Sequence, residues 1–313
     1  MASTEGKLNV SELDFTQIKE NLIGFLQNQD EFVGYNFRGS SFDVLLDVLA
    51  YNTHYNAYYA NMVANEMFLD SATLRNSVVA KAKHLGYLPR SAKGSKAVVD
   101  LTITPTGAPA VITIPRFTQF QGDVDGINYI WCTSNSHALN INANLIYTVS
   151  NVELTQGIPI SYRYTAETAD VDQRYLLPNA NIDTDTLTVT VQTSKTESAS
   201  FAYDLANDIT TVNSTSRHYF LDEVDEGLYE VQFGDGILGK EVSNGNIITL
   251  AGLVTDTDAT NGCKNFTTVA DVGGYSNVKI VTVDAAGGGA ASADIQEIKF
   301  NAPKSFDAQN RCV

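Results

Sequence analysis

Cysteine is scarce in this 313-residue sequence. The three copies are odd in number, lie far apart and form no C-x-x-C pair, at Cys132, Cys263 and Cys312. Structural zinc sites, dithiol redox centres and disulfide frameworks need cysteines in closely spaced or even-numbered sets. The sequence therefore argues against these classes and predicts ordinary thiols in a reducing compartment.

Positive charge and long apolar runs are scarce as well. Lys and Arg together number 20 against 36 Asp and Glu, for a net charge of -16. Charge of this sign repels phosphate backbones and anionic lipid, so we expect no nucleic-acid partner. The sequence has no uninterrupted apolar run of 18 residues and no basic-then-apolar N-terminus. It predicts a soluble protein, made in the cytoplasm, without direct membrane insertion.

Residues suited to catalysis do not gather in any recognisable pattern. The four histidines are remote from one another, at His54, His84, His137 and His218. They form no H-E-x-x-H pair, and no G-x-S-x-G segment marks a serine nucleophile. Metal and triad sites need several converging partners. We therefore predict that the protein is not an enzyme and binds no metal or cofactor.

Carboxylates do cluster, in three places. The clusters are Asp222 with Glu223, Asp225 and Glu226; Asp123 with Asp125; and Asp183 with Asp185. A calcium loop needs six to eight oxygen ligands in a longer pattern, which none of these segments completes. We interpret all three clusters as solvated turns.

One stretch, "VQFGDGILGKEVSNGN" at 231–246, matches two nucleotide-binding patterns. G-x-G-x-x-G runs through Gly234, Gly236 and Gly239, and G-x-x-x-x-G-K ends at Lys240. Both patterns bind phosphate only where the glycine turn leads from a strand into a helix. No helical pattern follows, and Glu241 occupies the place of the magnesium-binding Ser or Thr. The sequence therefore argues against a nucleotide site.

The same stretch has a structural interpretation. Gly234, Gly236 and Gly239 would let a strand turn sharply where positive φ is needed. Asp235 would then bond the backbone of its own turn rather than a ligand. Further on, the pair at 244–245, Asn-Gly, is a hairpin signal between two β-prone runs.

The first 90 residues have a helical pattern. Apolar residues recur at helical spacing in 13–29, where Ser11 and Asp14 resemble a capping box. From Ser41 the chain runs without Gly or Pro up to Gly86, which predicts two or three helices in 41–85. Gly86 supplies a C-terminal cap, and the proline at 89 prevents continuation.

Beyond residue 91 the pattern changes to alternating Val, Thr and Ile with turn residues between, as in short strands. A Gly-rich joint at 285–292 precedes a short helix that we expect to stop before Pro303. Helices followed by strands predict an α+β multidomain fold, an N-terminal helical region followed by elongated antiparallel β-rich domains. The expected parts are a helical region at 1–90, a β-rich core at 91–165, an inserted β domain at 166–255 and a return to the core at 256–313.

Tyrosine and asparagine are concentrated in the second helical segment. This face comprises Tyr51, Tyr55, Tyr58 and Tyr59 with Asn52, Asn56 and Asn61. Both residue types combine apolar area with hydrogen bonding, which suits packing against another chain. We expect these tyrosines, with Phe15 and Leu22 of the first helix, to contact a partner. The alternative is that they pack on the β-rich part of the same chain.

Several segments resemble a known family. They are "FRGSSFDVLLDVLAYNTHYNAYYANMVANEMFLDSATLRNSVVAKAKHLGYLPRS" at 37–91, "IPRFTQF" at 114–120, "DQRYLLPNANIDTDTLTVTV" at 172–191, "VQFGDGILGKEVSNGNIITL" at 231–250 and "IQEIKFNAPKSFDAQNRCV" at 295–313. They are similar to the baseplate wedge subunits of T-even-like contractile-tail phages, within the baseplate J-like family. Phe117 stands where that family has glycine, Lys299 where it has arginine, and Arg311 is retained.

The resemblance implies a structural virion protein of the phage tail baseplate. Such wedge subunits pair with themselves and with other wedge proteins through their N-terminal helices. The baseplate's change of shape on host contact then triggers sheath contraction. The family continues well past the Q-x-R-x-V motif at 309–313, where this chain ends, so we expect a chain truncated at its C-terminus.

A function from another class stays open at this point. The β-rich region is rich in Thr and Asn and contains tyrosines, which can hold sugars by stacking and hydrogen bonding. The alternative is therefore a carbohydrate-binding or carbohydrate-active tail protein. Trp131, the single tryptophan, is its candidate stacking residue.

Overall fold

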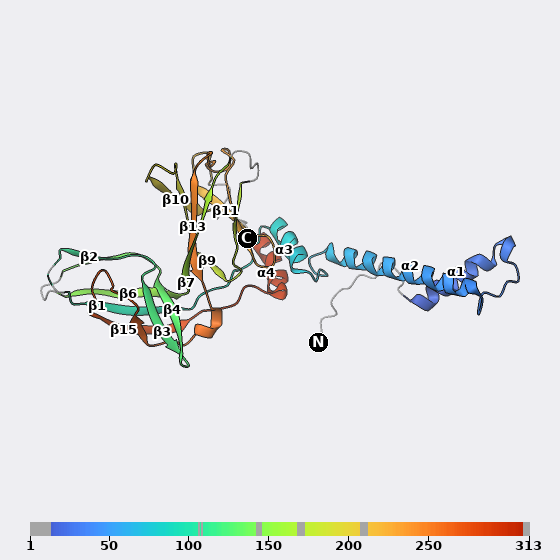
Figure 1. The fold of residues 1–313 in the computed structure, drawn as a ribbon, viewed down its shortest axis with the longest axis horizontal. Helices are drawn as coiled ribbons and strands as arrows, with labels where there is room; N and C mark the ends of the chain where they lie inside the picture. Colours follow the sequence, from blue (N-terminus) through green and yellow to red (C-terminus); the bar gives the residue numbers. More distant parts are fainter. Residues whose placement is uncertain are drawn as a thin grey trace. The chain divides into compact units, whose positions relative to one another are not determined.

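The computed structural model describes residues 14–308 except 106, 108, 142–145, 168–172 and 207–211 (Figure 1). Its contacts divide the chain into a helical unit, 1–87 with 295–313, and a β-rich unit, 88–294. The predicted α+β class, helices followed by mainly antiparallel β structure, is confirmed.

Helix α1 (Phe15–Gln27) folds back along helix α2 (Ser41–Glu66), with a short 3-10 turn (Asp30–Phe32) between them (Figure 1). The carboxylate Oδ1 of Asp14 accepts the backbone N–H of Gln17 at 3.0 Å. The N-cap is therefore Asp14 itself, because its short side chain reaches the free donors of the first turn. The expected capping box places Asp14 three residues after the N-cap, and this placement is wrong. Ser11 itself lies outside the described residues.

Helix α3 (Arg75–His84) is tied to the end of α2 by a carboxylate. Oε1 of Glu66 accepts the Thr73 backbone N–H and the Thr73 hydroxyl, both at 2.7 Å, and the Leu74 N–H at 3.3 Å. Glu66 is the last residue of α2, and its carboxylate thus accepts hydrogen bonds from the residues just before α3. At the other end, Gly86 has φ 71°, and the N–H groups of Gly86 and Tyr87 bond back into the last turn, as expected for a glycine cap.

Helix α4 (Ile295–Ala308) lies beside α3 (Figure 1). It passes through Pro303, so the expectation that it stops before this proline is wrong. Ile298 and Ala302 are buried on one face, and the Lys299 ammonium donates to the Asp70 carbonyl at 2.9 Å. Burial of this face outweighs the one backbone hydrogen bond that a proline removes.

The first sheet of the β-rich unit is antiparallel, with strand order β14-β3-β4-β6-β1-β15. Its strands are β1 (Lys96–Ile103), β3 (Gln119–Val124), β4 (Ile127–Thr133), β6 (Tyr147–Gln156), β14 (Phe266–Thr268) and β15 (Val278–Gly287). A ribbon of β2 (Val111–Ile114) and β5 (His137–Asn140) shares its core. Trp131 is fully buried there and packs edge-on against Phe266, with ring centroids 5.1 Å apart.

The second sheet has strand order β7-β13-β9-β10-β11-β12-β8. Its strands are β7 (Ile158–Thr165), β8 (Arg174–Leu177), β9 (Ile182–Gln192), β10 (Ser200–Leu205), β11 (His218–Glu223), β12 (Tyr229–Phe233) and β13 (Ile247–Val254). The β10–β11 pair is parallel and the other pairs are antiparallel. The Tyr164 hydroxyl of β7 donates to the Leu176 carbonyl of β8, which links the two edge strands.

Buried polar groups join the two sheets at what we call the inter-sheet junction. The Gln156 amide donates to Asp256 at 2.7 Å and accepts from Thr255 at 2.7 Å and from the Asp256 N–H at 2.9 Å. The Asp183 carboxylate accepts the Gly94 N–H at 3.0 Å. Burial raises the pKa of Asp183. Gln156, Thr255 and Asp183 are buried whereas Asp256 is exposed, so these bonds compensate the desolvation cost of the buried groups.

Two of the expected features differ from the structure. The chain enters the second sheet at Ile158, before the expected boundary at 166, because β7 pairs along β13. The clusters interpreted as solvated turns include two buried carboxylates, Asp183 and Glu223. That interpretation is wrong for these two, because both lie within strands whose side chains alternate between the interior and solvent.

Candidate partner-binding surface

Helix α2 has an apolar face that the chain leaves exposed. Six residues follow one another at alternating steps of four and three along this face, Val44, Val48, Tyr51, Tyr55, Tyr58 and Met62. We call this row the α2 seam. Its side chains are between 41% and 65% exposed. A seven-residue apolar repeat of this kind is the pattern of helices that pack side by side.

The three tyrosines of the seam form a chain of ring contacts with Tyr59, which lies beside the seam. Ring centroids lie 4.5 Å apart for Tyr51 and Tyr55, 6.3 Å for Tyr55 and Tyr59, and 6.0 Å for Tyr58 and Tyr59. A hydrogen bond with Tyr55 raises the pKa of the Tyr51 hydroxyl. The rings therefore present a connected surface of apolar faces with hydroxyls at the edge, which suits an interface.

The opposite side of α2 packs on α1 and on the chain between them. Leu46 and Ala50 are buried on that side. Phe15 and Leu22 of α1, both predicted partner contacts, are half-buried within the chain. The Lys19 ammonium lies 2.8 Å from a carboxylate oxygen of Asp43 and 2.6 Å from one of Asp47, and these carboxylates raise the pKa of Lys19. These ion pairs connect α1 to α2, and the packing of α1 on α2 leaves the seam uncovered.

The sequence pattern predicts part of this surface. The four tyrosines are exposed, but Asn61, which we grouped with them, is buried and lies on the other side of the helix. Helical spacing explains this, because eleven residues are close to three full turns, so position 61 falls about 20° from the buried Ala50. Val44, Val48 and Met62 were missed. The four-three spacing from Val44 would have revealed all three without a structure.

The Gly-rich stretch after β12 forms a compact turn. Oδ1 of Asp235 accepts the N–H groups of Ile237 and Leu238, both at 2.9 Å, and these bonds lower the pKa of Asp235. Gly236 and Gly239 have φ of 83° and 91°. The expected need for positive φ does not hold at Gly234. A side chain there would instead meet the backbone of Leu238 and Gly239, at 2.3 to 2.5 Å.

The next helix or strand of the described residues after this turn is the strand β13, so the strand-turn-helix context of a phosphate site is missing. Gly245 does adopt a turn conformation with φ 81°. The expected hairpin is wrong, however, because 240–242 is not a strand and β13 pairs with β7 and β9. The Gly245 N–H instead bonds to the Ala166 carbonyl at 2.9 Å, beyond the end of β7.

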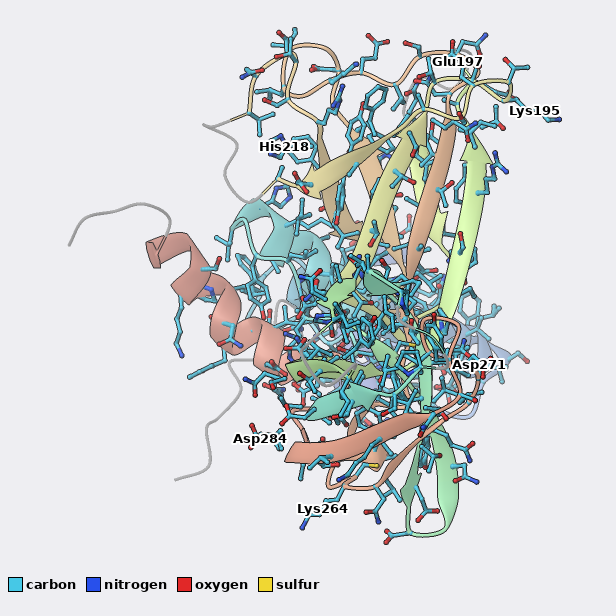
Figure 2. The ribbon with its side chains drawn as sticks, turned by 90° about the vertical axis from the view of Figure 1, so that its left-hand side faces the viewer. Lys195, Glu197, His218, Lys264, Asp271 and Asp284 are labelled. Carbon is cyan, nitrogen blue, oxygen red and sulfur yellow. The ribbon has the colours of Figure 1, made fainter. Side chains whose placement is uncertain are left out.

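Other candidate residues lie apart. The histidines belong to four different elements, and His218 begins β11 (Figure 2). Within the described residues, three or more His, Cys, Asp or Glu side chains nowhere gather as a metal site would require. Trp131 is buried, so the suggestion that it stacks on a sugar is wrong. Cys132 and Cys263 are buried free thiols, and Cys312 and Arg311 lie outside the described residues.

Among the described residues, no helix has the combined length and apolarity that crossing a bilayer requires. The longest one, α2, is interrupted by polar residues such as Asn52, Asn56 and Asn61.

The helical region is similar to a known protein family. Residues 14–87 match the family model described as "Baseplate wedge protein gp6-like, helical domain". The chain is 28% identical to the baseplate wedge protein gp6 of Enterobacteria phage T4 across 96% of its own length. It covers 48% of gp6, so the chain spans about half the length of this relative.

A solved structure is also similar. The cryo-EM structure of the anti-feeding prophage baseplate aligns with 97% of this chain and 62% of the other, at 12% identity and a TM-score of 0.30. A TM-score this low carries no argument about the arrangement of the chain. The resemblance found in the sequence is nonetheless confirmed: the chain is similar to phage baseplate wedge proteins over nearly its whole length, and residues 14–87 match their helical domain.

Proposed function

We propose that this protein is a structural component of a phage contractile-tail baseplate wedge. It assembles with a second copy of itself and with other wedge subunits, and takes part in the baseplate rearrangement that triggers sheath contraction. In this role it is a virion protein of the tail baseplate and acts by assembly rather than by catalysis. The similarity to gp6 over most of the chain supports this role.

The exposed α2 seam is the observation that carries the proposal. An isolated surface helix normally has one apolar stripe, which faces the core of its own protein. Helix α2 has a second, which spans Val44 to Met62 and has no charged residue in its row. Exposed apolar patches of this extent mark interaction sites. Helices from a second copy and from other wedge proteins would bury it in a shared bundle.

The tyrosines would act as anchors of that bundle. Tyrosine is enriched among the few interface residues that supply most of the binding energy. The ring contacts from Tyr51 to Tyr59 restrain these side chains before binding, which lowers the entropy lost on association. Phe15 and Leu22 of α1 would contribute at the rim, because they are half-buried already.

The first experiment is size-exclusion chromatography with light scattering on the purified chain across a dilution series. We expect a dimer that dissociates on dilution. The double variant Tyr55→Ala/Tyr59→Ala should weaken association by about 2 kcal/mol or more, roughly thirtyfold in Kd, while the helical circular dichroism is retained.

Ile237→Ala is the matched control, because it removes a large apolar side chain that is 75% exposed, more than either tyrosine, from the β-rich unit. It should leave the dimer unchanged. A wild-type chain that is monomeric at every concentration would contradict pairing through the seam. A double variant that loses helical structure would instead assign Tyr55 and Tyr59 to the fold.

A further inference from the structure

Arg116 lies between β2 and β3 and reaches across to the second sheet. One guanidinium nitrogen, Nη2, donates to the Thr186 carbonyl at 2.8 Å, and Nη1 donates to the Thr188 hydroxyl. Both acceptors are neutral and belong to β9. An arginine has five N–H donors, so these two bonds leave most of its capacity unused.

The charge of Arg116 has no partner among the described residues. No carboxylate of the described chain pairs with it within 4.0 Å, and its Nε is buried without a hydrogen-bond partner. The neighbouring cations are paired: Lys96 with Glu153 at 3.0 Å, and Lys93 with Asp185 at 2.7 Å. Burial lowers the pKa of Arg116. A half-buried cation is costly unless it is paired, and this one is unpaired in a chain of net charge -16.

The next residue, Phe117, holds the guanidinium in place and is itself strained. Its ring lies beneath Arg116, with the guanidinium carbon 4.6 Å from the ring centroid. Its φ is 64°, in the left-handed region that disfavours a bulky side chain. Backbone strain of this kind persists where the surroundings enforce it, often at binding sites. A glycine would relieve the strain but would remove the ring.

Two hollows adjoin this pair of residues. The larger, about 530 Å³, is lined by Pro115, Arg116, Phe117, Gln119 and Asp271 with the backbone of Gly273. Asp271 is labelled in Figure 2. A smaller one of about 200 Å³ lies on the side of Thr186 and Asp185. Arg116 is thus reachable from a hollow large enough for one or two side chains, with a proline and an aromatic ring in its wall.

We propose that Arg116 is the receptor for a carboxylate, carried by an Asp or Glu side chain of a partner protein that enters the larger hollow beside Phe117. A carboxylate matches the second N–H group that Nη1 and Nη2 each leave unused. Asp271 lines the same hollow, which favours a single negative charge over the two of a phosphate. The apolar wall of Pro115 and Phe117 suits the methylene groups of an acidic side chain. The site lies in the β-rich unit and does not depend on the α2 seam.

The experiment titrates the full chain with a capped hexaglutamate peptide and, in parallel, with hexaglutamine. Binding is measured by calorimetry and by the NMR signal of the arginine Nε–H groups. Hexaglutamate should bind saturably, more weakly as salt is raised, and should shift the Arg116 signal. Hexaglutamine should not bind. The net charge of the chain repels an acidic peptide, which removes most non-specific binding.

Arg116→Gln should weaken hexaglutamate binding at least tenfold. Arg217→Gln is the matched control, because Arg217 also stacks on a phenylalanine, 4.0 Å from the ring centroid of Phe201, and should leave binding unchanged. If Arg116→Gln does not fold, Arg116→Lys takes its place, with at least a threefold loss expected because lysine lacks the planar fork.

Two results would overturn the proposal. One is hexaglutamate binding of equal strength in the wild type and in the Arg116 variant. The other is the absence of saturable binding to the wild type at low salt. Glucuronate, a small sugar acid, is titrated as a third probe. If it binds at Arg116 more tightly than the peptide, the carrier of the carboxylate is a small molecule, and the assignment to a partner protein is wrong.

Discussion

The two units of this chain use large apolar side chains in opposite ways. In the β-rich unit, strand after strand alternates buried and exposed residues, and two clusters of fully buried side chains result. In the helical unit, α1 buries none of its described residues, 15–27, and α2 leaves most of its large apolar side chains exposed. The β-rich unit buries enough apolar side chains to fold by itself, whereas the helices leave apolar surface exposed that another chain can cover.

Tyrosine shows the same contrast within one residue type. In the β-rich unit Tyr229 is fully buried, and its hydroxyl donates to the Pro89 carbonyl at 3.0 Å. In the α2 seam, Tyr51, Tyr55 and Tyr58 are exposed. The rings of Tyr51 and Tyr55 contact each other, and the ring of Tyr58 contacts that of Tyr59 beside the seam. A buried tyrosine needs a partner for its hydroxyl within the chain. An exposed row of tyrosines has no such need, so burial rather than residue type separates a core from a binding surface.

The sharpest test of this comparison is a pair of truncations. Trp131→Ala should lower the free energy of unfolding of the β-rich unit by about 3–5 kcal/mol, because it opens a cavity in a packed core. Tyr58→Ala in the seam should lower the stability of the monomer by less than about 1 kcal/mol, since the side chain is exposed. Urea unfolding followed by circular dichroism measures both. Equal losses for the two variants would contradict the assignment of Trp131 to a packed core and of Tyr58 to an exposed surface.

A second test uses alkaline pH. Burial raises the pKa of Tyr219 from 10.0 to about 12, and the carboxylate of Asp204 adds to the effect. The unfolded chain then releases this proton more readily than the folded one. Stability from Tyr219 is therefore complete below pH 10 and is lost as pH rises from 10 to 12, by about 3 kcal/mol.

Unfolding free energies measured between pH 9 and pH 12 provide the test, with Tyr219→Phe as the reference. The phenylalanine variant should lose less stability than the wild type over this range, because it has no proton to release. Parallel curves for the two proteins would show that Tyr219 titrates normally despite its burial.

The smallest effect is expected where α1 meets α2. Lys19→Ala removes the ion pairs with Asp43 and Asp47, which are partly open to solvent. Such pairs contribute little, so we expect only slightly lower helical content, and less difference at high salt. Circular dichroism at low and high salt measures it. A loss that salt leaves unchanged would indicate that Lys19 acts through packing of its stem.

Much of the fold could be predicted from local sequence because local rules decide it. The cap at Gly86 and the change to alternating β residues after position 91 depend on neighbours in the chain. The continuation of α4 through Pro303 does not, because it depends on burial of Ile298 and Ala302. The burial of Asp183 was also out of reach, since its partner Gly94 is distant in sequence.

The candidate surfaces divide in the same way. The α2 seam lies on one helix, so spacing alone reveals it, including the valines that we overlooked. Whether the tyrosines face another chain or their own could not be decided from spacing, because exposure depends on the rest of the fold. Arg116 could not be recognised as unpaired either. Its surroundings come from β9 and from loops that are distant in sequence, so only the folded structure shows that no carboxylate of the described residues pairs with it.

The inter-sheet junction has a mechanical consequence. Gln156 and Asp183 bond groups that lie far away in sequence, on either side of the passage between the sheets. A pull that separates the sheets must break these bonds together, and the buried Gln156 amide and Asp183 carboxylate then lose hydrogen bonds that offset the cost of their burial. The β-rich unit should therefore respond to force as one rigid body. Its two sheets should separate abruptly, rather than gradually, once the force is large enough to break these bonds.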